Sequence, residues 1–444
     1  MTPAIEERMG LFSELVEAVE ADLVRIREGL DMHQFCAYWG AHEIFGYIDG
    51  AVCVVHGTSG CMSNRRFLLP FGGADKCHLE PQYTTAFSEH DVIFGGERKL
   101  AEAIALVQER HNPKLIAVIT NCCADIIGDD VGGVVRGMEK DGQRIVWLHT
   151  GGFTGKSYRK GTEEAFNALA RLMAEAPPKQ VVPGTINLFP RRWVWGENQQ
   201  REAAEGIRML EKLGLKVNSI LRKGIPYEEF LDLRTAEANV SQCFFWSMEL
   251  FEQMSRHFGT KQIKASNPVG LTSSLAWMEA TARTMGIDYD FDNDPEVAEL
   301  KELRERVRAR VGRGRKAVVW TQTGEKLVGL VKFARDLGLD PVAVGVDPAI
   351  VRDKMGMFRK ELNDGFDVPL YLSSYVEEIK GFVDSLDDPV VICNEDYFPG
   401  RVVFRHRYNG QQTYGLEGAR SMYGEFLHAL DNRRSRYSFL REAV

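Results

Sequence analysis

Three cysteines in the first third of the chain stand where an apolar run gives way to small residues or to a helix. Cys36 opens Cys-Ala-Tyr-Trp-Gly-Ala, Cys61 closes His-Gly-Thr-Ser-Gly-Cys, and Cys122 opens Cys-Cys-Ala-Asp-Ile-Ile-Gly-Asp-Asp. Zinc knuckles and ribbons take their ligands as close pairs, and these thiols are spaced far too widely for that. The spacing suits thiolates that separate strand–helix turns deliver to one point. Soft thiolates without local pairs indicate an iron–sulfur cluster before zinc.

A buried structural thiol is the alternative for each of these cysteines, because free cysteines are among the most buried residue types. The neighbouring residues favour the cluster. Gly57 and Gly60 allow the backbone to approach a bulky group closely. A turn that leads into a helix also offers backbone N–H groups to anionic sulfur. We therefore expect Cys36, Cys61 and Cys122 to bind metal.

A further cysteine, Cys243, ends Ala-Asn-Val-Ser-Gln-Cys and precedes a helix expected to run through Met254. Its thiol is therefore expected near a helix N-terminus, where a thiolate is stabilised. From this chemistry alone, a ligand and a buried structural thiol are equally well supported.

The elements that must position these thiols are strands that alternate with helices. Strands of the buried type are expected at 51–55, 115–119 and 144–148, a helix at 99–110, then strands at 184–188 and 216–221 around a helix at 198–213, and strands at 316–320, 342–346 and 390–394. This alternation predicts parallel sheets, in which ligands gather at the carboxyl ends of strands. Cys61, Cys122 and a glycine turn at 151–155 each follow such an end.

A chain of 444 residues is too long for one ordinary core, so several domains are expected. The predicted class is α/β, with three Rossmann-like domains whose parallel sheets are flanked by helices. The expected units are a helical arm over 1–32, a cluster-binding domain over 33–178, a second domain with Cys243 over 179–312 and a third over 313–444. The Arg- and Glu-rich stretch 299–315 is interpreted as a solvated helix and linker.

The composition excludes several classes of function. With 44% hydrophobic and 27% charged residues it is typical of a globular protein, and its formal net charge of −8 argues against a general nucleic-acid surface. Eight cysteines without a secretory signal predict reduced thiols and a cytoplasmic protein. No apolar run approaches the roughly 20 residues needed to span a membrane. No Gly-x-x-x-x-Gly-Lys-Ser/Thr loop is present, so ATP binding by that route is not expected.

Four segments also occur in a fixed order: Cys36-Ala-Tyr-Trp-Gly-Ala, His56-Gly-Thr-Ser-Gly-Cys61, Asp91-Val-Ile-Phe-Gly-Gly-Glu-Arg-Lys-Leu100 and Cys122-x-x-x-Ile-Ile-Gly-Asp-Asp130. Together they resemble the cluster-binding region of the nitrogenase component 1 superfamily. The resemblance implies that Cys36, Cys61 and Cys122 are this subunit's share of a bridging iron–sulfur cluster, either P-cluster-like or 4Fe–4S. Cys123 falls one place off the family position and is interpreted as a neighbour.

The resemblance further implies an alpha-type subunit with a complex iron–sulfur cofactor between its domains, the heterometal being open. The family places a cofactor-ligating cysteine before a Ser-Met helix and upstream of a glycine turn, as with Cys243 and 267–271. It also places a histidine ahead of a turn like Tyr414-Gly-Leu-Glu-Gly418, which implies His406 as a second ligand of that cofactor. Arg405 and His428 are the alternatives.

Two pocket positions depart from the nitrogenases. Tyr158 and Thr162 stand where those enzymes carry a glutamine and a histidine, and a third-domain turn is replaced by Thr321-Gln-Thr-Gly-Glu325. These changes disfavour dinitrogen reduction, because neither hydroxyl replaces a histidine as proton donor near neutral pH. Retained cluster and cofactor cysteines with an altered pocket most resemble the methylthio-alkane reductases, which cleave carbon–sulfur bonds. Tyr158 and Thr162 are then the expected catalytic pocket residues.

Two functions of different classes follow from the resemblance. The first is a catalytic subunit that takes electrons from an ATP-dependent iron–sulfur reductase protein and reduces small thioethers; a nitrogenase proper is its variant. Three thiolates are fewer than a cube of iron and sulfur needs, so a beta-type partner subunit should complete the site, and the family implies an α2β2 assembly. The second is a non-catalytic scaffold for cofactor assembly.

Overall fold

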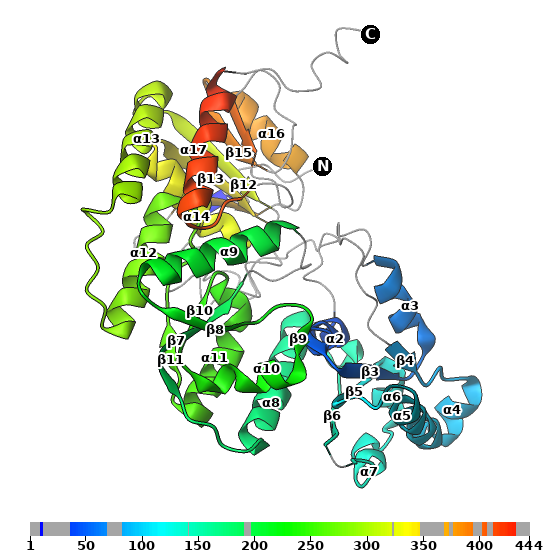
Figure 1. Ribbon diagram of the computed structural model, residues 1–444. Coiled ribbons are helices and arrows are strands. Elements are labelled where there is room, and N and C mark those ends of the chain that lie inside the picture. The colour runs from blue at the N-terminus through cyan, green and yellow to red at the C-terminus, as the bar shows by residue number, and fades with distance from the viewer. Residues whose placement is uncertain are drawn as a thin grey trace.

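The computed structural model describes residues 9–11, 36–68, 82–140, 142–190, 197–321, 324–346, 368–372, 376–393, 402–405 and 412–431. Over these residues the chain forms three main sheets, one after another along the sequence, with helices packed against them (Figure 1). Neighbouring strands are parallel in all but one pair. The predicted α/β class with parallel sheets is confirmed. No helix in the described part of the chain is long and apolar enough to cross a membrane.

The first sheet has the strand order β4-β3-β5-β6. Its strands are β3 (Ala51–His56), β4 (Gln82–Thr84), β5 (Leu115–Thr120) and β6 (Arg144–Leu148), and its helices are α2 (Ala37–Phe45), α3 (Ser59–Leu68), α4 (Glu89–Phe94), α5 (Glu97–His111), α6 (Cys122–Ile127), α7 (Val131–Val135), the 3-10 turn η4 (Gly152–Thr154) and α8 (Tyr158–Glu175). Every residue of β3 and β5 is buried, because α5 and α7 pack on one face and α2 and α8 on the other. Because both faces of these strands are buried, their sequences are nearly continuous runs of apolar residues.

The backbones of α2 and α8 touch, and this contact places the first cysteine. A Cβ atom on Gly40 would lie 2.0 Å from the carbonyl oxygen of Tyr158, and one on Gly161 would lie 1.9 Å from that of Ala37. At the start of this contact, Cys36 forms an isolated bridge with Ser157. The residue that precedes α2 is therefore fixed against the turn that precedes α8.

The second sheet, β11-β10-β7-β8, is parallel throughout. Its elements are β7 (Val182–Phe189), α9 (Glu197–Lys212), β8 (Lys216–Ile220), α10 (Tyr227–Asp232), the 3-10 turn η5 (Leu233–Thr235), β10 (Ala236–Ser241), α11 (Phe244–Phe258), β11 (Lys261–Ile263), α12 (Gly270–Met285) and α13 (Pro295–Val311). A two-residue pair, β2 (Ile48–Asp49) with β9 (Ile225–Pro226), joins it to the first lobe. The stretch predicted as a solvated helix is α13, although its apolar residues Val297, Leu300 and Val307 are buried.

The third sheet has the order β1-β14-β13-β12-β15-β16. Its elements are β1 (Met9–Leu11), β12 (Lys316–Thr321), α14 (Gly324–Asp336), β13 (Asp340–Val346), β14 (Pro369–Leu372), α16 (Val376–Ser385), β15 (Val390–Cys393), β16 (Val402–Arg405) and α17 (Gly415–Asp431). One continuous apolar core joins this sheet to the second, and another joins α2 and α8 to α11. Figure 1 shows α9 between the second sheet and α17.

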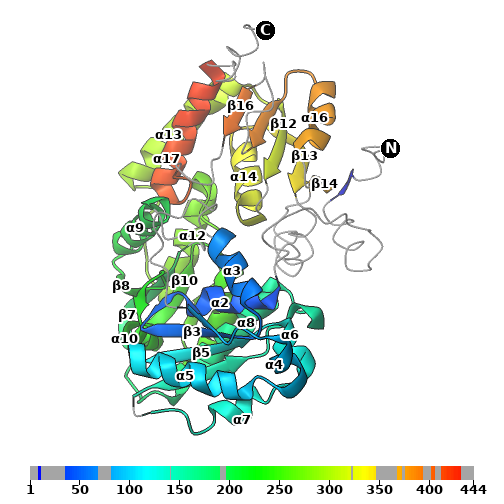
Figure 2. The same ribbon diagram turned by 90° about the vertical axis from the view of Figure 1, so that its right-hand side faces the viewer.

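The helical prediction is wrong where the structure describes the N-terminal arm. Met9–Leu11 form β1, which pairs antiparallel with β14 at the edge of the third sheet, as Figure 2 shows. The free edge of β14 offers unpaired backbone groups, and satisfying them outweighs the helical periodicity of this short stretch. The remainder of the expected arm, 1–8 and 12–32, lies outside the described residues.

Candidate metal centres

The three predicted cluster cysteines stand at three helix N-termini. Cys36 is the N-cap residue of α2, Cys61 lies in the first turn of α3, and Cys122 is the first residue of α6. α3 follows the carboxyl end of β3, and α6 follows that of β5. The open N–H groups of a helix start carry partial positive charge, which is a favourable setting for a metal-bound sulfur.

The turn at Gly152 shows that two of these thiols face one point. The N–H of Gly152 donates a hydrogen bond of 3.1 Å to the sulfur of Cys122. A Cβ atom built on Gly152 would lie 3.4 Å from the sulfur of Cys36 and 3.8 Å from that of Cys122. The two sulfurs can therefore be no farther apart than the sum of those distances. Cys36 and Cys122 are also among the neighbours that raise the pKa of Cys61, so Cys61 lies in the same part of the lobe.

The electrostatics of the protein alone favour protonated thiols. Burial raises the pKa of Cys36, and the neighbouring Cys122 adds to the rise, although two backbone N–H groups of α2 oppose it. Burial also raises the pKa of Cys61, and Cys36, Cys122 and Cys123 all add to that rise. Thiolates so close together repel one another, and the iron of a bound cluster would supply the positive charge that lets them ionise together.

The arrangement fits a multi-iron cluster better than one ion. Within the described ranges, no group of three or more His, Cys, Asp and Glu side chains is placed to hold a single metal ion. The ligands of one zinc ion all lie about 2 Å from it, whereas those of a cluster bind different irons and stand farther apart. Three half-buried thiols fit the second case.

A buried pair beneath the thiols was missed by the sequence analysis. His56, the last residue of β3, has its Nε2 2.9 Å from the Oδ2 of Asp129 and its Nδ1 3.2 Å from the hydroxyl of Thr85. The N–H of Gly96 donates to the same Asp129 oxygen at 3.0 Å. Burial lowers the pKa of His56 although Asp129 opposes the shift, so the imidazole is held neutral. The pair fixes the loop that carries Cys61 to the segment that follows α6.

Beside the thiols lies a surface that we call the apolar face: Ile93 and Phe94 on α4, Ile126 on α6 and Phe153 on η4. These side chains are 71%, 72%, 66% and 81% exposed, and α4 and η4 both pack against α6, whose first residue is Cys122. Large apolar side chains grouped in this way mark an interaction site.

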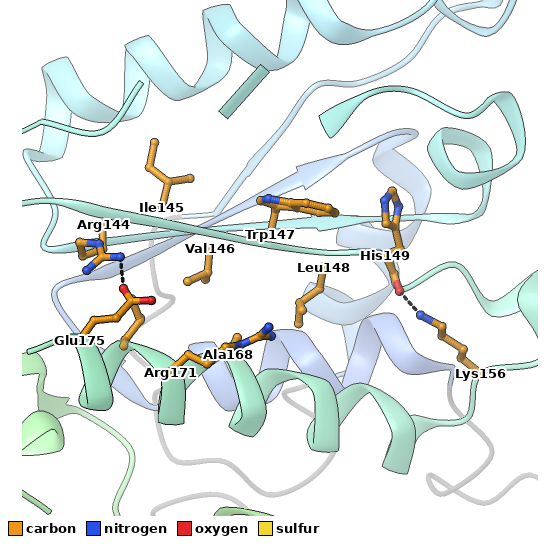
Figure 3. Close-up of a pocket in the computed structure, with 11 residues that line it drawn as sticks. Arg144, Ile145, Val146, Trp147, Leu148, His149, Lys156, Ala168, Arg171 and Glu175 are labelled. Atoms are coloured by element: carbon orange, nitrogen blue, oxygen red, sulfur yellow. Dashed lines mark hydrogen bonds and ion pairs between the residues drawn. The ribbon is translucent and has the colours of Figure 1, made fainter. Parts of the chain in front are cut away.

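The first lobe also has an open groove of about 510 Å³ between β6 and α8 (Figure 3). Arg144 is ion-paired with Glu175, and Lys156 donates to the carbonyl of His149 and pairs with Glu164. The free edge of β6 is covered at one point, where the N–H of Ile145 donates to Glu139 at 2.9 Å.

Cys243 is the N-cap residue of α11, as the sequence predicted, and is fully buried. Its N–H donates to the hydroxyl of Ser241 at 3.0 Å. The core that contains Cys243 also includes Phe166 of α8, and Cys36 and Cys61 pack against the same core. A continuous apolar medium therefore lies between the first thiol site and this second thiol.

Two turns predicted around the second site meet in the structure. Val269, from 267–271, forms an isolated bridge with Tyr414, and the N–H of Gly415 donates to the carbonyl of Pro268 at 2.8 Å. The N–H of Glu417 donates to Glu205 of α9 at 3.0 Å. The starts of α12 and α17 are thereby joined to each other and to the middle of α9. The other predicted ligand, His406, lies outside the described residues.

Buried polar atoms that lack a hydrogen-bond partner indicate whether a polar cofactor could be held near these helix starts. Among the buried polar atoms of the described residues that have no hydrogen-bond partner, five belong to this region: Gln199 Nε2, Gln242 Oε1, Ser247 Oγ, Ser273 Oγ and Thr413 Oγ1. They come from the starts of α9, α11, α12 and α17 or the residues just before them, and two hydrogen bonds tie α9 and α12 to the residues before Cys243. Each unpaired atom costs about 1–3 kcal/mol. A polar cofactor fits this region, and Cys243 would hold it.

Tyr158 and Thr162 lie on the face of α8 that packs against α2. Tyr158 is 3% exposed, and its hydroxyl donates to Glu43. The hydroxyl of Thr162 donates to the carbonyls of Tyr158, at 3.2 Å, and Arg159, at 2.8 Å. Both predicted pocket hydroxyls therefore already have acceptors within the protein.

Parallel α/β lobes, with thiols from separate helix starts near one turn, fit a metal-binding oxidoreductase subunit. The chain belongs to the nitrogenase component 1 type oxidoreductase family, whose model matches residues 36–381. The chain is similar to the nitrogenase iron-molybdenum cofactor biosynthesis protein NifE of Clostridium pasteurianum, with 29% identity over 326 residues, 70% of this chain and 67% of that protein. It is also similar to the nitrogenase molybdenum-iron protein alpha chain of Clostridium pasteurianum, with 29% identity over 274 residues, 60% of this chain and 49% of that protein.

A solved structure described as nitrogenase Cp1 at pH 6.5 superposes with a TM-score of 0.67 at 18% identity. The match covers 92% of this chain and 94% of that one. This likeness shows the fold.

Proposed function

We propose that the chain is the cofactor-bearing subunit of a cytoplasmic, ATP-dependent, nitrogenase-like reductase. In this proposal Cys36, Cys61 and Cys122 hold a bridging iron–sulfur cluster, and Cys243, with His406, holds a second iron–sulfur cofactor. The observation that carries it is the approach of the Cys36 and Cys122 sulfurs to one point beside Gly152, with Cys61 as an electrostatic neighbour of both. When bound, the two groups supply one-electron transfer and a reducing centre.

The residues of this chain prepare the sites for that chemistry. The N–H of Gly152 stabilises negative charge on the Cys122 sulfur, and hydrogen bonds to sulfur tune the potential of a cluster. The shared apolar core excludes water between the two thiol sites. The unpaired polar atoms near Cys243 would orient the cofactor or the substrate.

The apolar face supports a partner. A beta-type component 1 subunit that covers it would shield half-exposed thiols from water and oxygen, and the proposed assembly is α2β2. Because the chain has no phosphate-binding loop of the Walker type, ATP hydrolysis is assigned to a separate iron–sulfur reductase protein.

For the substrate we propose small thioethers, each reduced with two electrons and two protons to a thiol and a hydrocarbon. The pocket positions support this choice. Tyr158 and Thr162 have hydroxyls that already donate within the protein, so they are better placed to shape a pocket than to deliver protons.

The test uses the complex purified without oxygen, with its reductase, ATP and methylthio-ethanol. Headspace gas chromatography should detect the hydrocarbon, and ammonia should be absent under dinitrogen. If ammonia formed at a rate comparable to that of the hydrocarbon, the thioether proposal would be wrong and the chain would be a subunit of a nitrogenase proper. Elemental analysis and EPR of the same preparation identify the metals, and Cys61→Ala should lose iron and partner together.

A cofactor-assembly scaffold is the second candidate. It is favoured by the similarity to NifE proteins, which includes 29% identity over 342 residues to that of Nostoc sp., 74% of this chain and 68% of that protein. Sustained turnover by the purified complex supports the reductase. Stoichiometric transfer of a metal cofactor to another protein, without turnover, supports the scaffold.

A further inference from the structure

The side-chain amide of Asn121 joins the starts of two helices that carry predicted cluster cysteines. Asn121 is the N-cap residue of α6, whose first residue is Cys122, and its Oδ1 accepts the N–H of Cys123 at 3.1 Å. Its Nδ2 donates to the carbonyl oxygen of Thr58 at 3.0 Å and to the hydroxyl oxygen of Thr58 at 3.1 Å. Thr58 directly precedes α3, which carries Cys61 in its first turn. One side chain therefore bonds to the start of α6 through its acceptor and to the start of α3 through its donor.

The amide packs against the chain before α3 without spare room. Asn121 is 2% exposed. Gly57 has a φ of +136°, and a Cβ atom there would lie 1.9 Å from the Asn121 Oδ1 and 2.6 Å from its Nδ2. Glycine at this position lets the amide lie directly on the backbone. The backbone N–H of Asn121 also donates to the carbonyl of His56 at 3.0 Å, so the main chain and the side chain of one residue both hold this segment.

The donor half of this amide is not needed to cap α6. Aspartate and serine cap a helix about as well as asparagine, because a cap needs only an acceptor for an open N–H group. The hydrogen bonds of Nδ2 go instead to Thr58, at the start of the other helix. Burial raises the pKa of the Cys61 thiol, and Asn121 is the neighbour that opposes this rise. Both effects of the donor therefore act on the helix that carries Cys61.

We propose that Asn121 is a positioning residue for the bridging cluster, whose amide holds the starts of α3 and α6, and with them Cys61 and Cys122, at the separation that the cluster needs. The inference rests on the proposed function, since it needs iron bound by these cysteines. Ligands of one cluster bind different irons of a rigid body, so the distance between them is fixed by the cluster. Asn121 itself binds no metal and acts through the two helix starts.

The first test uses the isolated full-length chain without metal. Asn121→Ser and Asn121→Asp keep an acceptor that caps α6 but lose the donor to Thr58. Hydrogen–deuterium exchange over residues 56–68 should be at least tenfold faster in both variants, while exchange over α6 is unchanged. Serine is neutral and aspartate is charged, so an effect that both share comes from loss of the donor. Asp130→Asn is the matched control, because Asp130 caps α7 through the N–H of Gly133 at 2.7 Å, and it should leave residues 56–68 unchanged.

The second test uses the complex purified without oxygen. Iron content should fall at least twofold in both Asn121 variants, and the cluster that remains should have a changed EPR spectrum and a shifted reduction potential. A residue that only caps α6 would alter none of these, since both variants keep the cap. Circular dichroism checks that the variants fold.

Exchange over residues 56–68 at the unmodified rate in both Asn121 variants would overturn the inference. So would full iron content with an unchanged EPR spectrum and reduction potential in both variants, and the proposed function would then stand. An unmodified complex without an iron–sulfur cluster would overturn the proposed function, and with it this role of Asn121.

Discussion

The N–H of Gly152 lies 3.1 Å from the sulfur of Cys122, so the turn before α8 and the start of α6 form one wall of the thiol site. The relationship follows from the sheet. β5 and β6 are adjacent parallel strands, and the segments that leave their carboxyl ends must emerge side by side. Residues far apart in sequence thus share one site.

Gly152→Ala should disrupt this wall. The added Cβ would lie 2.7 Å from the Cβ of Cys36, so the turn must move and the N–H···S hydrogen bond must lengthen. We expect the iron content of the reconstituted chain to fall at least twofold, with a shift in the cluster's reduction potential in what remains. Gly424→Ala, where an added Cβ meets nothing within 4 Å, is the matched control. Equal iron content in the two variants would contradict the proposed site.

His56 should make the apo chain less stable in acid. Burial holds its pKa below the ordinary value, against the opposing carboxylates Asp129, Glu97 and Asp125. The unfolded chain therefore takes up a proton near pH 6.5, before the native state does. The contribution of His56 to stability is complete above about pH 6.5 and is lost as the pH falls toward the lowered native value.

The check is chemical denaturation of the apo protein at pH 7.5 and 5.5, for the unmodified chain and for His56→Gln. Glutamine keeps a donor for Asp129 but does not titrate. The unmodified chain should lose more unfolding free energy between the two pH values than the variant does. Equal losses would show that His56 takes up its proton at the same pH in both states.

Much of the fold was predictable because buried parallel strands leave a strong local pattern. The run 144–148 corresponds residue for residue to β6, and 115–119 lies within β5. β1 could not be predicted in this way, since three residues at a sheet edge carry no pattern of their own and their partner β14 is far along the chain.

The thiol site was partly predictable from the sequence. Glycine turns and helix starts indicated Cys36, Cys61 and Cys122. Cys123, interpreted as a neighbour, lies beside Cys122 in the first turn of α6, where its N–H donates to Asn121. Gly60 has open space where a Cβ atom would lie, so its expected role in admitting a bulky group stays a prediction. The sequence also did not predict the unpaired polar atoms near Cys243. Polar residues at the start of a helix are usually interpreted as solvent-exposed capping residues.

The apolar face should control assembly. Replacing Phe94 and Phe153 by serine removes two large exposed side chains without touching a thiol. We expect the double variant to fold normally, as circular dichroism would show, but to bind the beta-type subunit at least tenfold more weakly, measured by sedimentation or by co-purification. Trp147→Ser is the control, since Trp147 is 39% exposed and lies on β6, outside the face. Undiminished association of the double variant would place the partner on another surface.

Cys243→Ser should separate the two proposed metal centres. Cys243 is fully buried at the start of α11, in a different lobe from the other thiols, and serine preserves its size and the backbone N–H bond to Ser241. The variant complex should therefore keep the EPR signal of the bridging cluster and its iron. It should lose the second cofactor, and hydrocarbon release from methylthio-ethanol should fall at least a hundredfold, because a neutral hydroxyl is a poor ligand for a soft metal centre. Cys393→Ser, at a buried cysteine in β15, controls for the change of a core thiol and should leave both centres intact. If Cys243→Ser retained both metal centres and turned over at the rate of the unmodified complex, Cys243 would have no part in the mechanism.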